Sequence, residues 1–104
     1  NAADTLVLAS SREGWANVLL ESMACGTPVV ASNVWGTPEV VAAPAAGVLM
    51  PQRTPEGLVA ALSQLRANYP AHSATRRYAE DFGWQPTTQG QIDLFHSILA
   101  RKAA

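Results

Sequence analysis

The sequence has little of what identifies several common classes of protein. It contains one cysteine among 104 residues, so no disulfide can form within the chain. Its formal net charge is −1, which gives no electrostatic basis for binding nucleic acid or an anionic membrane. Glycine, proline or charged residues interrupt every apolar stretch, so no window could span a bilayer. We therefore expect one small domain or part of one, in a reducing compartment such as the cytoplasm.

The sequence also has few residues that could bind a metal ion or act as a thiol nucleophile. Cysteine, histidine and carboxylate residues do not recur at the spacings of metal ligands, so we predict no metal site. The lone Cys25 stands beside Gly26 at a predicted helix end. We expect Cys25 to be a small buried residue there rather than a nucleophile.

The most informative part of the sequence is one strand–helix–strand pattern. Residues 5–9 form an apolar run without alternation, which is typical of a strand covered on both faces in a parallel sheet. A helical pattern near 16–25 follows and ends at Gly26, because Pro28 cannot continue it. The second apolar run, 28–32, lies one crossover connection later. We expect these two strands to be parallel and adjacent.

The start of this helix lacks a side chain that could cap it. Neither Gly14 nor Trp15 carries a side-chain oxygen, so the first amides have no local acceptor and could bind an anion such as phosphate. Glu21 is the only charge within the helix, and such a carboxylate must lie at an edge, take a partner or meet a ligand. The same pattern also fits an ordinary unit with a solvated glutamate and a water-capped helix. Residue pattern alone leaves both interpretations open.

A longer motif surrounds these features. Glu13 and Glu21 are separated by seven residues, within the gap-free run E-G-W-A-N-V-L-L-E-S-M-A-C-G-T-P-V-V. This run resembles the E-x7-E signature of the retaining group 1 glycosyltransferases (glycosyltransferase family 4). The later segments W-G-T-P-E (35–39) and G-V-L-M-P (47–51) are similar to further family motifs. F-G-W (82–84) resembles the family's F-S-W, with Gly83 in place of the capping serine.

The resemblance assigns roles to two acidic residues. It implies that Glu13 approaches the donor sugar near the reacting carbon, which makes it the candidate catalytic residue. We expect Glu13 to act as an electrostatic support rather than as a nucleophile. The resemblance further implies that Glu21 accepts hydrogen bonds from the ribose hydroxyls of the donor.

A set of donor-binding residues follows from the same resemblance. The amides of Asn17 and Val18 at the helix start would hold the diphosphate. The Ala16 amide is given less weight, because many family members carry proline at that position. Trp15 either forms one side of the phosphate-binding loop or anchors that loop to the core. Trp35 either lines the donor cleft or only packs in a turn. The predicted donor-binding residues are Gly14, Trp15, Ala16, Asn17, Val18, Glu21, Trp35 and Gly36.

The remaining chain completes an α/β pattern. Thr37 is predicted to cap a short helix that begins at Pro38, and Thr54 to cap a longer one that begins at Pro55. We predict a partial Rossmann-like layer of about three parallel strands flanked by helices. The strands are expected near 5–9, 28–32 and 47–50, and the helices near 16–25, 55–69, 73–82 and 84–101.

By resemblance, residues 1–104 correspond to the second half of the C-terminal, nucleotide-sugar-binding domain of a GT-B enzyme. That implies a fragment that is inactive alone. The intact enzyme would transfer a sugar from a UDP- or GDP-linked donor with retention of the anomeric configuration, and it would need no cofactor. A saccharide or lipid-linked acceptor would bind an N-terminal domain, in the cytoplasm or at its face of the membrane. A nucleotide-sugar epimerase, a phosphorylase and a non-catalytic nucleotide-binding or interaction domain remain open as alternative functions.

Without an upstream strand, residues 5–9 would leave an unpaired sheet edge, so we expect a dimer there.

Overall fold

Three parallel strands form the centre of the fold in the computed structural model, which describes residues 2–103. In spatial order they are β1 (Leu6–Leu8), β2 (Val29–Ser32) and β3 (Gly47–Met50). The register pairs Leu6 with Val29, and Val29 with Gly47. The predicted α/β class and the parallel, adjacent strands are confirmed, although β1 is one residue shorter at each end than expected.

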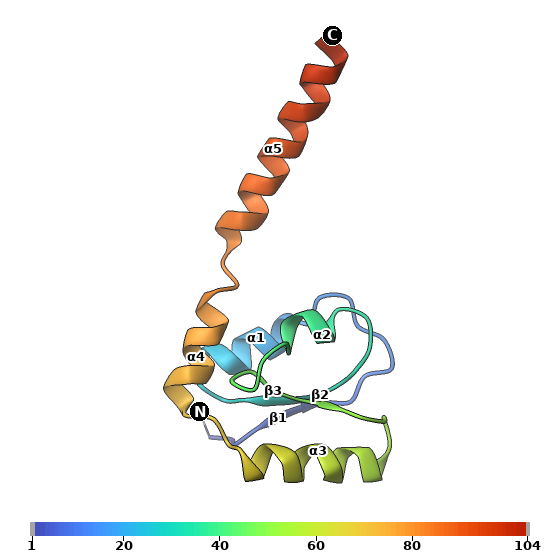
Figure 1. The fold of residues 1–104 in the computed structure, drawn as a ribbon, viewed down its shortest axis with the longest axis vertical. Coiled ribbons are helices and arrows are strands. Elements are labelled where there is room, and N and C mark those ends of the chain that lie inside the picture. Colours follow the sequence, from blue (N-terminus) through green and yellow to red (C-terminus); the bar gives the residue numbers. More distant parts are fainter. Residues whose placement is uncertain (1, 104) are drawn as a thin grey trace.

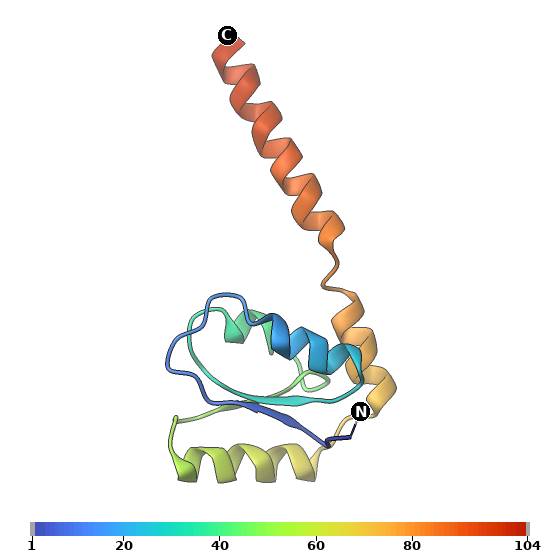
Figure 2. The ribbon, with the colours of Figure 1, turned by 180° about the vertical axis from the view of Figure 1, so that it is seen from behind.

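Helices lie on both faces of this sheet (Figures 1 and 2). One face carries α1 (Asn17–Ala24) and α2 (Thr37–Val40), and α4 (His72–Glu80) packs beside α1. The other face carries α3 (Pro55–Ala67), which packs on β2 and β3. The chain ends in α5 (Trp84–Ala103), which projects away from the sheet.

β2 is buried on both faces because α1 packs on one face and α3 packs on the other. Val29 and Ala31 belong to the core beneath α1, which also contains Leu19 and Met23. Val30 faces the opposite way, into the core beneath α3. A strand covered on both sides needs apolar residues at consecutive positions, which explains the unbroken apolar run in the sequence.

β1 is less covered than its apolar sequence suggested. Leu6 and Leu8 pack against the core beneath α1, but Val7, on the other face, is 39% exposed. The expectation of cover on both faces is therefore wrong for this strand. The reason is its place at the sheet edge, because α3 packs on β2 and β3 instead.

The two predicted threonine caps have different outcomes. Thr54 Oγ1 accepts a 3.0 Å hydrogen bond from the Gly57 amide, so the predicted cap of α3 is confirmed. Thr37 is instead the first residue of α2, whose N-cap is Gly36. The Thr37 hydroxyl is fully buried and donates to the Ser32 carbonyl oxygen at 2.5 Å, so it ties the helix to the end of β2 rather than capping it.

The later helices lie close to their predicted ranges. α3 ends at Ala67, two residues before the predicted end, and α4 spans His72–Glu80 rather than 73–82. α5 contains no buried residue among those described, and its large apolar side chains are exposed, namely Trp84, Ile92, Leu94, Phe95, Ile98 and Leu99. Within residues 2–103, no helix combines the length and the hydropathy that a bilayer-spanning segment requires.

Candidate functional site

The candidate site lies where β1 and β2 end. In open parallel sheets, ligands bind outside the carboxyl ends of the strands, where the loops that lead into the helices gather. The loop from β1 to α1 carries Glu13, Gly14 and Trp15, and the loop from β2 to α2 carries Trp35 and Gly36. The fold therefore brings two separate segments of the predicted donor-binding set to one edge of the sheet.

Gly36 lets these two loops touch. A Cβ atom added to Gly36 would collide with the carbonyl oxygen of Gly14 and would lie 3.9 Å from Cα of Trp15. The backbone of the second loop thus supports the backbone that precedes α1. Only a residue without a side chain permits this approach, so Gly36 has a structural reason to be glycine.

Glu13 is held by a hydrogen bond from its own loop. Ser10 Oγ donates to Glu13 Oε1 at 2.7 Å, and the carboxylate is half-buried. Ser32, at the end of β2, is buried, and its hydroxyl donates to the Ser10 carbonyl oxygen at 2.5 Å. The candidate catalytic carboxylate is therefore connected to the sheet through two serines.

The start of α1 has the uncapped character expected from the sequence. Its N-cap is Ala16, which offers no side-chain hydrogen bond, and no acidic residue lies in the first turn. The Asn17 amide donates to the Trp15 carbonyl oxygen at 3.1 Å. No hydrogen bond found among residues 2–103 uses the Val18 amide. Of the two amides predicted to bind the diphosphate, Val18 is thus the one left free, at the positive end of the helix dipole.

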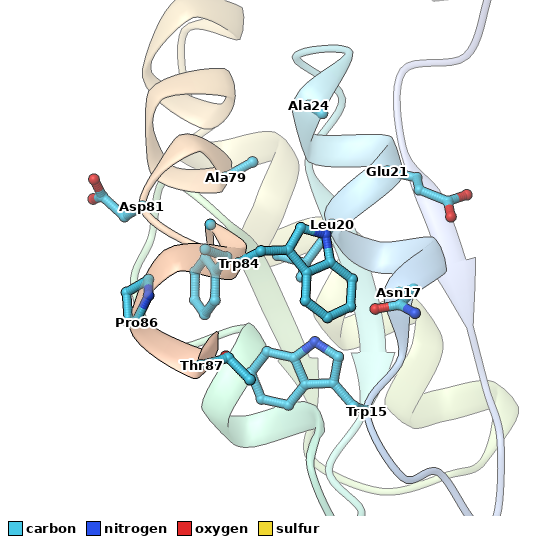
Figure 3. A pocket seen from close by; sticks show the side chains of 12 residues that line it. Trp15, Asn17, Leu20, Glu21, Ala24, Ala79, Asp81, Trp84, Pro86 and Thr87 are labelled. Carbon is cyan, nitrogen blue, oxygen red and sulfur yellow. The ribbon is translucent and has the colours of Figure 1, made fainter. Parts of the chain in front are cut away.

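Glu21 lies one turn into α1 and is exposed. Figure 3 shows its side chain on the same side of the helix as Asn17 and directed away from Trp84 and Asp81. Leu19 and Met23, on another face of α1, are fully buried. The helical spacing thus leaves the Glu21 carboxylate in solvent, available to a ligand.

A hollow of about 810 Å³ lies between α1 and the junction of α4 with α5 (Figure 3). It is lined by Trp15, Asn17, Leu20, Glu21, Ala24, Ala79, Asp81, Phe82, Gly83, Trp84, Pro86 and Thr87. Of the predicted site residues, this lining includes Trp15, Asn17 and Glu21. It does not include Glu13, Gly14, Ala16, Val18, Trp35 and Gly36.

Trp35 has an unusual backbone conformation. Its φ of 50° is in the left-handed region, which bulky residues rarely adopt, and its side chain is 72% exposed. The indole is therefore not packed in a turn, which was one of the two interpretations of this residue. Residues held in such a conformation cluster at ligand sites and switch regions.

Cys25 differs from expectation. It is exposed at the C-terminal end of α1, not buried, because the helix ends there and the left-handed Gly26 turns the chain away. Across the described part of the chain, no three cysteine, histidine or acidic residues gather as metal ligands would.

The structure also brings residues to the site that were not predicted. Ser10 follows β1, and Ser32 is the last residue of the adjacent parallel strand β2, a signal that the sequence does contain. The Phe82 ring lies 6.0 Å from the Trp15 ring, between centroids, and 5.3 Å from the Tyr78 ring. No local sequence pattern predicts these aromatic contacts, because they depend on how α4 packs beside α1.

Comparisons with known proteins agree with this architecture. The family model for glycosyl transferases group 1 matches residues 1–82. A D-inositol 3-phosphate glycosyltransferase of Saccharomonospora viridis is 33% identical over 103 residues, which cover 95% of this chain and 24% of that protein. A D-inositol 3-phosphate glycosyltransferase of Geodermatophilus obscurus is 36% identical over 104 residues, which cover 99% of this chain and 23% of that protein.

A solved structure supports the same relationship. Sucrose-phosphate synthase from Thermosynechococcus elongatus superposes with a TM-score of 0.77 at 28% identity, over 96% of this chain and 26% of that one. The chain thus spans about a quarter of the length of the relatives it matches. Because the family model matches residues 1–82, which is most of the sequence, this chain belongs to the group 1 glycosyltransferases.

Proposed function

We propose that this chain is the C-terminal part of the donor-binding domain of a retaining glycosyltransferase with a GT-B fold. The observation that carries the proposal is the uncapped start of α1, with Glu13 held on the turn before it and Glu21 exposed one turn after it. A helix start with a free amide attracts phosphate through both its N–H group and its dipole. The diphosphate of a nucleotide sugar is the ligand we assign to this position.

The chemistry needs few groups from the protein. The bond between the anomeric carbon and the β-phosphate oxygen breaks, and the acceptor oxygen bonds to that carbon from the same face. The acceptor's proton passes to the departing phosphate oxygen. The helix start, including the Val18 amide, stabilises the charge that develops on the diphosphate. Glu13 supports the positive charge that develops near the anomeric carbon, and Ser10 keeps its carboxylate in place.

Glu21 binds the other end of the donor in this proposal. Its exposed carboxylate accepts hydrogen bonds from the two ribose hydroxyls, which fixes the nucleotide along α1. The nucleotide is UDP or GDP, and no separate cofactor takes part. A saccharide or lipid-linked acceptor binds an N-terminal domain, and the reaction takes place in the cytoplasm or at its face of the membrane. The greater length of the relatives supports a larger enzyme around this chain.

The isolated chain has an edge that a second copy could use. β1 lies at the end of the sheet, and Val7 in it is partly exposed. Strand edges of this kind pair readily with other chains. We propose that two copies of the isolated chain associate along residues 5–9.

The test of the transfer function uses the enzyme that contains this chain. Glu21→Ala and Glu13→Gln are compared with Glu80→Gln, a change to an exposed glutamate that pairs on the surface of α4 with Arg76. Loss of a hydrogen bond to a charged group costs about 1.5–3 kcal/mol, so Glu21→Ala should raise the donor KM roughly ten- to hundredfold. Glu13→Gln should lower kcat strongly. Glu80→Gln should change neither value.

Thermal unfolding and product analysis separate the alternatives. Melting temperatures of both site variants should stay near that of the wild type, because Glu21 is exposed and Glu13 is half-buried. A loss of melting temperature in step with the loss of activity would mean that the glutamates are structural. Incubation with labelled UDP- and GDP-sugars should yield a glycosylated acceptor. An epimerised nucleotide sugar as product, or no binding of either nucleotide, would contradict the proposal.

A further inference from the structure

Phe82 lies against the loop that precedes α1, although it comes from the far end of α4. Its ring centroid is 6.0 Å from that of Trp15, with the planes inclined by 51°. This separation and tilt are typical of a favourable aromatic pair. The Phe82 amide donates to the Ala79 carbonyl oxygen at 3.1 Å, so Phe82 continues the last turn of α4 and does not move freely with α5.

The Phe82 ring is itself held in place by Tyr78. The two ring centroids are 5.3 Å apart, with the planes inclined by 54°. The Tyr78 hydroxyl donates to the Val40 carbonyl oxygen at 2.8 Å and accepts from the Ala42 amide at 3.1 Å. Three aromatic rings thus connect the C-terminal end of α2 with the turn before α1.

Trp15 is supported from two directions. Gly36 backs the chain at Gly14 and Cα of Trp15, and Phe82 contacts the indole. Trp15 is 47% exposed, so the contact with Phe82 is a substantial part of what holds its indole. Trp15 directly precedes the N-cap Ala16, so its position bears on the direction of the first helical amides.

We propose that Phe82 is a positioning residue for donor binding. It does not touch the donor. It fixes Trp15, and through Trp15 the backbone that presents the free Val18 amide to the diphosphate. The proposal rests on the function proposed above for the start of α1. It assigns a role in donor affinity to a residue far from the E-x7-E motif in sequence.

The first experiment observes Trp15 directly. The chain contains three tryptophans, so labelling with 5-fluorotryptophan should give three ¹⁹F resonances, and Trp15→Phe identifies the one from Trp15. Phe82→Leu should shift the Trp15 resonance and leave that of Trp35 in place. Phe82→Tyr, which keeps the ring, should restore the position of the Trp15 resonance. Phe95→Leu, the same change at an exposed position on α5, should leave all three resonances unchanged.

The second experiment measures donor kinetics in the enzyme that contains this chain. An aromatic pair of this kind contributes enough to predict a rise in donor KM of roughly two- to tenfold for Phe82→Leu, with a smaller change in kcat. Phe82→Tyr should have a KM close to that of the wild type. If Phe82→Leu does not fold, Phe82→Met replaces it, because methionine fills similar space without a planar ring.

Three results would overturn this inference and leave the proposed function standing. The first is an unchanged Trp15 resonance in Phe82→Leu, and the second is an unchanged donor KM for Phe82→Leu in an enzyme whose wild type saturates with donor. Equal effects of Phe82→Tyr and Phe82→Leu would also contradict it, since they would point to general packing. A wild-type enzyme that binds no nucleotide sugar would overturn this inference together with the proposed function.

Discussion

The hydroxyl of Ser10 donates a 2.7 Å hydrogen bond to Oε1 of Glu13. Ser10 is itself held, because its carbonyl oxygen accepts from the buried hydroxyl of Ser32 at the end of β2. The candidate catalytic carboxylate is therefore oriented through Ser10 from the end of β2 in the sheet.

Ser10→Ala should reduce transfer more than stability. The substitution removes the only side-chain hydrogen bond that the structure gives to Glu13 among residues 2–103, so the carboxylate can leave its position. We expect kcat/KM to fall roughly tenfold, as for a hydrogen bond to a charged group, with a loss of unfolding free energy below about 1 kcal/mol. Steady-state kinetics and urea unfolding measure the two effects. Ser11→Ala, at the exposed neighbouring serine, should behave as the wild type, and equal losses from both variants would contradict the proposed orientation of Glu13.

Gly36→Ala should weaken donor binding through a steric conflict. Its φ of −80° is ordinary, so the cost comes from the collision of the new Cβ with the Gly14 carbonyl oxygen. We expect a loss of about 1–3 kcal/mol in unfolding free energy and a higher donor KM, because the loop before α1 must move. Gly90→Ala is the control, since a Cβ there meets open space within α5 and should stabilise the helix by about 0.5–1 kcal/mol. A Gly36→Ala enzyme with unchanged donor KM would show that the two loops are not coupled.

Gly47→Ala should unfold much of the domain. Gly47 begins β3 with a φ of +141°, and an added Cβ would collide with the backbone of Val29 in the adjacent strand. Both the conformation and the space exclude a side chain, so we expect a loss above about 4 kcal/mol, measured by urea unfolding. Gly83→Ala, where a Cβ meets nothing within 4 Å, should change stability by less than about 0.5 kcal/mol. Similar stabilities of the two variants would contradict the β2–β3 register.

Thr75→Val tests how α4 is attached to the rest of the fold. The Thr75 side chain is fully buried, and its Oγ1 donates to the Ala45 carbonyl oxygen at 2.7 Å. Valine has nearly the same shape but cannot donate, so the partly buried Ala45 carbonyl loses its partner at a cost of about 0.5–1.5 kcal/mol. The same change at the exposed Thr88 should leave the unfolding midpoint in urea unchanged. An unaltered midpoint for Thr75→Val would indicate that water replaces the lost donor.

Val7→Lys should abolish the dimer proposed for the isolated chain. A lysine on an edge strand opposes pairing with another chain, and Val7 lies in β1 at the sheet edge. Sedimentation equilibrium should show a concentration-dependent dimer for the wild type and a monomer for Val7→Lys. Val59→Lys places the same charge on an exposed position of α3 and should remain dimeric. A wild-type chain that stays monomeric at all concentrations would exclude association along residues 5–9.

The sequence by itself determined the elements and their order. Consecutive apolar residues predict β2, helical periodicity with Gly26 and Pro28 predicts α1 and its end, and Thr54 predicts the start of α3. The missing cap at Ala16 could also be predicted, since only the residues at the helix start decide it. These features depend on backbone hydrogen bonding and side-chain periodicity within a few residues, so a local pattern contains the information.

Only the tertiary structure decided which loops and side chains meet. The contact of Gly36 with Gly14, the link from Ser32 through Ser10 to Glu13, and the pairing of Phe82 with Trp15 join segments that are distant in sequence. The incomplete cover of β1 and the departure of α5 from the sheet were likewise decided there. Such contacts depend on strand order and on how α4 packs beside α1. Many different sequences share the local patterns described above, but the relative placement of distant segments follows from packing the whole chain around one sheet.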